Sequence, residues 1–301
     1  MKRRTFLKTS VILPAVSTTG WSMKSYSQSP VERTGGPKLK LSLNAYSFNK
    51  PLREGKMSLD DLLNFCAKLN FDAVDPTGYY FPNYPAAPTD KFIYNFKRKA
   101  FLLGLDISGT GVRNDFAVPD AGKRKADVQL VKKWIKVAAK MGAPVLRVFA
   151  GRKVPPEHTW DQTAEWVAAG LRECADYAAE YGVIIALQNH AGFLKTADDV
   201  LKILKRVDSK WLGLMLDIGS FPTKDPYRDI EKVIPYAVTW QIKEKVKTID
   251  SPVKTDLPRL FKIINNSNYR GYLPIETLGE GDPKEKVTKF LQEVRKAISQ
   301  T

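Results

Sequence analysis

Apolar and polar positions along this chain switch repeatedly between two spacings. Short apolar runs, typical of buried strands, are followed by longer stretches in which apolar residues recur every three to four positions, typical of amphipathic helices. The predicted strands are Leu39–Ala45, Asp72–Asp75, Leu105–Gly109, Val145–Phe149, Val183–Gln188, Leu212–Asp217, Ala237–Ile242 and Tyr272–Glu276. The predicted helices are Leu59–Leu69, Lys91–Leu103, Asp120–Met141, Trp160–Tyr181, Ala197–Val207, Pro226–Ile234, Asp256–Ser267 and Pro283–Ile298.

Capping residues support several of these helix boundaries. Ser58 precedes one helix and Asp61 follows three positions later, which is the pattern of a capping box. Gly142 and Gly182 directly follow two other helices, where a left-handed residue commonly ends the helix.

Strands and helices that alternate without interruption favour a (β/α)8 barrel of the α/β class. A doubly wound open sheet is the main alternative, and it usually carries a glycine-rich turn after its first strand. Here the first strand runs into Asn44-Ala45-Tyr46-Ser47-Phe48, which contains no glycine. The sequence therefore predicts a single TIM-barrel domain over residues 39–301.

Four polar residues stand at or near the ends of four successive predicted strands in the second half of the chain. They are Gln188, Asp217, Gln241 and Glu276. Because the carboxyl ends of barrel strands meet at one mouth, we expect these side chains to converge. Four convergent oxygen donors predict a site for a hard divalent cation.

The same segments resemble the xylose-isomerase-like superfamily of sugar isomerases and epimerases. The resemblance is carried by Leu-Asp-Ile-Gly at the end of the sixth strand, Gln-Ile-Lys-Glu at the seventh and Pro-Ile-Glu at the eighth, and it covers the chain after residue 38. It implies a divalent metal held by Glu, Asp, His and Glu, with the two glutamates moving the substrate proton. Asp217 and Glu276 match this pattern, whereas Gln188 replaces the first Glu and Gln241 replaces the His. A further His of the family is Ser220 here.

These replacements change the expected chemistry. An amide oxygen can ligate a metal but adds no charge, so two carboxylates and two amides suit Mn, Mg or Ca better than Zn. Glu276 is then the one proton-transferring carboxylate of the pair that remains. His190, just after the fifth strand, is a candidate second acid or base because neutral imidazole works near physiological pH.

Other polar residues near strand ends are candidates for binding substrate. They are Asn44, Tyr46, Asp75, Arg147, Asn189 and Lys243. Any one of them could instead be structural; Asp75, for example, could pair with a neighbouring arginine.

The charge of the chain does not indicate nucleic acid as a partner. The formal net charge is +16, but the lysines are spread over solvated helix faces rather than gathered with aromatic residues in one stripe. The superfamily also includes zinc-dependent abasic-site endonucleases, whose trinuclear sites need several histidines. This chain has only two histidines.

The first residues read as an export signal. Adjacent Arg3 and Arg4 precede a short apolar stretch, as in twin-arginine signals. The stretch is too short for a stable membrane span. We expect a signal peptide over residues 1–27, a linker over 28–38 and a periplasmic location.

Together these features predict an exported, metal-dependent enzyme that abstracts a proton next to a carbonyl of a small carbohydrate, as an isomerase or epimerase does. A lyase or hydratase acting on 3-keto-glycosides would share the same enediolate step. A catalytically silent sugar-binding barrel is the alternative from a different class, because a Glu and two His of the family pattern are replaced. The identity of the sugar and the oligomeric state stay open.

Overall fold

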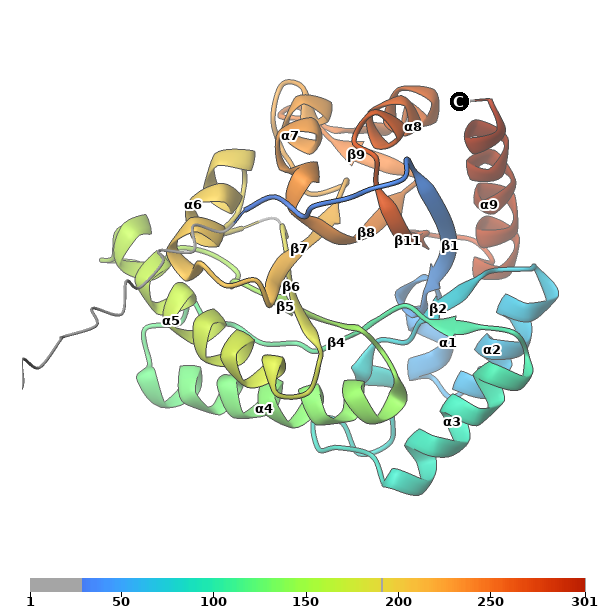
Figure 1. Cartoon of the computed structure of the whole chain (residues 1–301), viewed down its shortest axis with the longest axis horizontal. Helices are drawn as coiled ribbons and strands as arrows, with labels where there is room; N and C mark the ends of the chain where they lie inside the picture. Colours follow the sequence, from blue (N-terminus) through green and yellow to red (C-terminus); the bar gives the residue numbers. More distant parts are fainter. Residues whose placement is uncertain (1–28, 191, 301) are drawn as a thin grey trace, which may run out of the picture.

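The computed structural model describes residues 29–190 and 192–300, so the predicted signal peptide lies outside the described residues. Nine parallel strands form one nearly closed barrel in the order β3-β2-β1-β11-β8-β7-β6-β5-β4, surrounded by helices (Figure 1). The strands are β1 (Lys38–Asn44), β2 (Ala73–Asp75), β3 (Asp106–Ile107), β4 (Thr110–Gly111), β5 (Val145–Phe149), β6 (Ile184–Gln188), β7 (Leu212–Asp217), β8 (Ala237–Lys243) and β11 (Arg270–Glu276). The prediction of a single TIM-barrel domain is confirmed.

The third strand of the barrel is divided, unlike the single strand predicted over Leu105–Gly109. β3 pairs with β2, whereas β4 pairs with β5. Between them, the Ser108 hydroxyl forms hydrogen bonds with the Oγ of Ser42 at 2.7 Å and with a backbone carbonyl of β2. An isolated bridge between Thr77, which follows β2, and Gly111 in β4 links the two sides of this gap.

The long helices follow the predicted boundaries to within about two residues. They are α2 (Leu59–Lys68), α3 (Asp90–Leu102), α4 (Ala121–Met141), α5 (Trp160–Ala179), α6 (Ala197–Val207), α7 (Pro226–Val233), α8 (Leu257–Asn266) and α9 (Pro283–Ser299), with a short α1 (Asn49–Arg53) that was not predicted. Ser58 and Asp61 form the predicted capping box, and Gly142 ends α4 in the left-handed conformation. Over the described ranges, no helix has both the length and the apolar character needed to cross a membrane.

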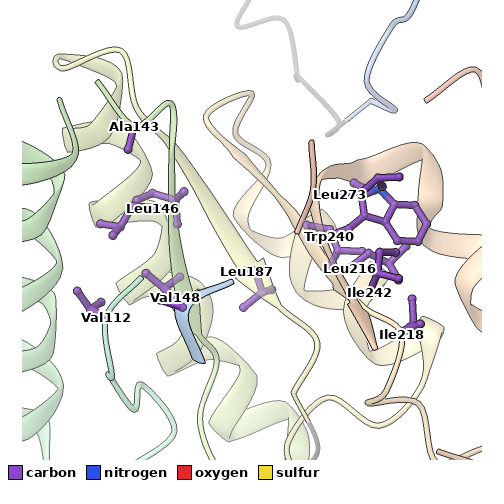
Figure 2. Packing of buried hydrophobic residues seen from close by; sticks show 14 of the residues in the cluster. Val112, Ala143, Leu146, Val148, Leu187, Leu216, Ile218, Trp240, Ile242 and Leu273 are labelled. Carbon is purple, nitrogen blue, oxygen red and sulfur yellow. The ribbon is translucent and has the colours of Figure 1, made fainter. Parts of the chain in front are cut away.

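Alternation along the strands separates two apolar layers. One set of side chains packs outward against the helices, and Figure 2 shows Leu146, Val148, Leu187, Leu216, Trp240 and Ile242 from this set. A smaller cluster of Val145, Ala186 and Met215 belongs to the alternate positions and fills the barrel interior. The positions that face the barrel interior continue to the strand ends, where they carry polar side chains at the mouth of the barrel.

A hairpin that the sequence analysis did not predict follows β8. Its strands β9 (Lys245–Lys247) and β10 (Pro252–Lys254) pair antiparallel. At its base the Thr255 hydroxyl donates to the carbonyl oxygen of Lys243 at 2.7 Å, and the Thr255 amide donates to the carbonyl of Glu244 at 2.9 Å. The end of β8 is therefore held in place by Thr255, the residue that follows the hairpin.

Candidate active site

A cavity of about 940 Å³ opens at the carboxyl ends of the strands. Most of the residues predicted for the site line it, from five strands and the turns that follow them. These are Asn44, Tyr46, Arg147, Gln188, His190, Gln241, Lys243 and Glu276. The volume is in the range of cavities that bind small molecules.

The four predicted metal ligands come together in a chain of hydrogen bonds. Gln188, Gln241 and Glu276 line the cavity, whereas Asp217 is fully buried beside them. The amide nitrogen of Gln188 donates to Asp217 Oδ2 at 2.8 Å and to Gln241 Oε1 at 2.6 Å. The amide nitrogen of Gln241 donates to Glu276 Oε2. Ionised carboxylate oxygens only accept hydrogen bonds, so each amide must turn its nitrogen toward its neighbouring carboxylate.

Lys243 lies between the two carboxylates of this group. Its Nζ is 2.8 Å from Asp217 Oδ2 and 3.3 Å from Glu276 Oε1, and its side chain is only 12% exposed. The residue was predicted to bind substrate, and it does line the cavity. Its contact with both acids was not predicted, although Lys243 is two residues after Gln241 on one strand and must therefore face the same way.

Their surroundings give the two carboxylates different acidities. Burial alone would raise the pKa of Asp217, but the nearby Lys243 charge and its hydrogen bond, with a contribution from His190, outweigh burial and lower this pKa. Burial also raises the pKa of Glu276, and the more distant ammonium only partly offsets it. Glu276 is thus the better base of the pair.

This donor set does not fit a divalent cation. The Lys243 ammonium already bridges both carboxylates, and the Gln188 and Gln241 nitrogens, rather than their oxygens, face them. Within residues 29–190 and 192–300, no group of three or more His, Cys, Asp or Glu side chains is placed to hold a metal ion. We therefore derive no step through a metal.

Asp217 is held by its neighbours on every side. Asn189 donates from Nδ2 to the Asp217 carbonyl at 2.9 Å and accepts from its amide at 2.8 Å. The Ser220 hydroxyl donates to Oδ2 at 3.0 Å, and the Gly219 amide donates to Oδ1 at 2.9 Å. Asn189, expected to bind substrate, is fully buried and has both polar ends occupied, so it positions Asp217 instead.

His190 lies at the mouth of the cavity. Its Nδ1 is 3.9 Å from Asp217 Oδ2, its side chain is 54% exposed, and its ring lies 5.1 Å from that of Phe149. This distance exceeds a hydrogen bond, so the imidazole can turn toward a ligand in the cavity. Phe149 is a lining residue that the sequence analysis missed.

Arg147 and Asp75 are both buried on the other side of the barrel. The guanidinium donates to the carbonyl of Val112 and to the hydroxyl of Tyr79. Burial raises the pKa of Asp75 to about 6 even though the Arg147 charge opposes this. Asp75 is 3% exposed and lies outside the cavity lining, which argues against the predicted direct contact with substrate. The expected pairing with an arginine is not seen among the described residues either, because the Arg147 guanidinium donates to Val112 and Tyr79.

Asn44 and Tyr46 reach the cavity from the turn after β1. The Asn44 Oδ1 accepts from the Tyr46 amide at 2.8 Å and caps the short 3-10 helix Ala45–Phe48. This local hydrogen bond fixes the turn and leaves both side chains lining the cavity.

Part of the chain is similar in sequence to an enzyme of known activity. Over 161 residues the chain is 24% identical to inosose dehydratase from Clostridium perfringens, a match covering 45% of this chain and 52% of that enzyme. The chain thus spans about half the length of this relative.

Two solved structures share the fold. D-psicose 3-epimerase from Clostridium cellulolyticum H10 has a TM-score of 0.70 and 16% identity, covering 86% of this chain and 99% of that one. The 3-keto-D-glucoside 4-epimerase from E. coli has a TM-score of 0.70 and 14% identity, covering 86% and 100%. Residues 63–297 match the family described as xylose isomerase-like TIM barrel. The chain therefore belongs to the xylose isomerase-like TIM barrel family.

Proposed function

We propose that this protein is an enzyme that breaks the C–H bond next to a ketone carbonyl of a carbohydrate or cyclic polyol, with Glu276 as the group that takes up the proton. Either epimerisation or loss of water can follow from this step. The relatives support the proposal by their printed activities, which are dehydration of inosose and epimerisation of psicose and of a 3-keto-glucoside.

The observation that carries the proposal is the position of Glu276. Its carboxylate lines the cavity at the end of β11, and its pKa is raised by burial. A base whose pKa approaches the working pH transfers protons efficiently in both directions. Asp217, with its lowered pKa and four hydrogen-bonding neighbours, is suited to holding Lys243 and not to moving protons.

One carboxylate base favours elimination, because a single group can remove the proton while water leaves. Epimerisation requires a proton to be returned to the opposite face, which needs a second acid. His190 is the residue placed for this, with an exposed imidazole on the same cavity. The two reactions therefore differ in their need for His190.

Proton exchange in D2O tests the proposal. Psicose, inosose and 3-keto-glucosides are incubated with the protein, and loss of the C–H signal beside the carbonyl is followed by NMR. We expect exchange on at least one ketone, a loss of about 100-fold or more in Glu276→Gln, and no effect of Glu280→Gln, an exposed carboxylate on the following loop.

The products separate the alternatives. A product with an inverted, deuterated carbon identifies an epimerase, and this product should not form with His190→Ala. An unsaturated ketone as product identifies a dehydratase. Tight binding of a sugar with no exchange on any ketone would identify a silent binding barrel and contradict the proposal.

We also propose that the protein acts outside the cytoplasm. The support is the paired Arg3 and Arg4 before a short apolar stretch. Cell fractionation tests this: replacement of both arginines by lysine should retain the protein in the cytoplasm, and equal export of the variant would contradict it.

A further inference from the structure

We propose that the ammonium group of Lys243 is a built-in cation that takes the place of a divalent metal, so that this barrel works without one. Its part in the reaction rests on the proposed function. Its occupation of the cation position rests on geometry alone and can be tested without a substrate.

The ammonium lies where a bridging ion would lie. It donates a hydrogen bond to Asp217 Oδ2 at 2.8 Å and forms an ion pair with Glu276 Oε1 at 3.3 Å. A divalent ion held by the same two carboxylates would have to sit beside this positive charge in a buried site, where like charges repel strongly. The two cations therefore exclude each other.

The amide side chains are arranged for an ammonium and not for a metal. Gln188 and Gln241 replace charged or imidazole ligands of the family pattern, and their nitrogens donate to the carboxylates. The single positive charge of Lys243 stands in place of the two charges of a divalent metal. The loss of one negative charge, where Gln188 replaces a Glu of the family pattern, matches this difference. The charge of the pocket is thereby kept in balance.

The lysine side chain is built into the fold. A Cβ at Gly219 would lie 2.7 Å from the Cδ of Lys243, so only glycine leaves room for the alkyl chain to cross this turn. The Thr255 hydroxyl holds the Lys243 carbonyl at 2.7 Å. Contacts on the stem and the backbone thus fix the ammonium between its two acids.

The position gives the ammonium a chemical role. It carries three N–H donors. One is donated to Asp217 and a second faces Glu276, which leaves one for a ligand oxygen in the cavity that Lys243 lines. When the C–H bond breaks, the proton goes to Glu276 and the electron pair moves through the new C=C bond onto the carbonyl oxygen. That oxygen then accepts a hydrogen bond from Lys243, and no oxidant or reductant is consumed.

Metal binding by wild type and variants tests the inference. Full-length protein is analysed for metals by mass spectrometry, and its melting temperature is measured in EDTA and in 1 mM Mn2+. We expect wild type to contain no stoichiometric metal and to melt equally in both. Lys243→Met, and Lys243→Met with Gln188→Glu, should melt about 5 °C higher in Mn2+ than in EDTA. Lys245→Met, which removes an exposed lysine two residues away, should behave as wild type.

Two results would overturn the inference. One is stoichiometric metal in wild type, or a rise of its melting temperature in Mn2+, and this arm needs no variant to fold. The other is a folded pair of Lys243 variants that ignore Mn2+. An absence of proton exchange in every ketone tested would refute the proposed function and leave these binding results unaffected.

Discussion

The buried carboxyl of Asp75 should make the fold less stable at neutral pH than at mildly acidic pH. Burial raises its pKa to about 6; the charge of Arg147 opposes this, the charge of Glu276 adds to it, and a hydrogen bond from Asn44 opposes it. The ordinary value for this carboxyl is 3.8. Between these two values the folded protein keeps the proton and the unfolded chain releases it, so the free energy of unfolding falls as the pH rises through this window and stays low above it.

The size of the effect follows from the shift. About 2 pKa units at about 1.4 kcal/mol each correspond to roughly 3 kcal/mol. Asp75→Asn cannot ionise, so it should match wild type near pH 4 and exceed its free energy of unfolding by about 3 kcal/mol at pH 8.

Urea unfolding followed by tryptophan fluorescence at several pH values measures this difference. Asp106→Asn is a control of opposite sign, because hydrogen bonds from Tyr272 and Lys40 lower the pKa of the exposed Asp106 carboxyl. That variant should lose stability at neutral pH relative to low pH. A difference between Asp75→Asn and wild type that does not change with pH would refute the reasoning.

Two further variants and a pH profile test the site. Gly219→Ala should cost about 1–3 kcal/mol in urea unfolding and displace Lys243, because its Cβ would overlap the lysine chain; an unchanged midpoint would contradict that contact. Asn189→Ala should cost about 2–3 kcal/mol, because it removes two hydrogen bonds to the backbone of the buried Asp217; a neutral effect would show that Asn189 does not hold it. On a ketone that exchanges, kcat/KM should fall on the acid side with a pKa above the ordinary 4.5 of a glutamate, because burial raises the pKa of Glu276; a limb at or below that value would contradict its assignment as the base.

Much of the fold could be predicted from the sequence because periodicity reports burial directly. The strand Val145–Phe149 and the helix Ala197–Val207 have the predicted bounds, since each has a clear apolar pattern and sharp ends. The division of the third strand could not be predicted, because it involves a contact between the Ser108 hydroxyl and Ser42 of β1, which is distant in the sequence. The β9–β10 hairpin was missed because its strands are short and largely exposed.

The site was predictable in its location and less so in its contacts. Parallel strands carry their ends to one mouth, so Gln188, Asp217, Gln241 and Glu276 could be expected to converge, and the structure brings them together. Alternation along β8 also places Lys243 on the cavity side. Which atoms it contacts depends on distances between strands that no single-sequence pattern encodes.

A charge carried by the chain itself differs from a bound ion in how it is supplied. Lys243 reaches its place whenever β8 folds beside β7 and β11, so its occupancy equals the folded fraction and does not depend on the metal content of the surroundings. Chelators cannot strip it and a competing metal cannot displace it. The corresponding disadvantage is that the ammonium has a single charge and a position limited by its side chain. It therefore cannot serve ligands that need a second coordination position or a stronger Lewis acid.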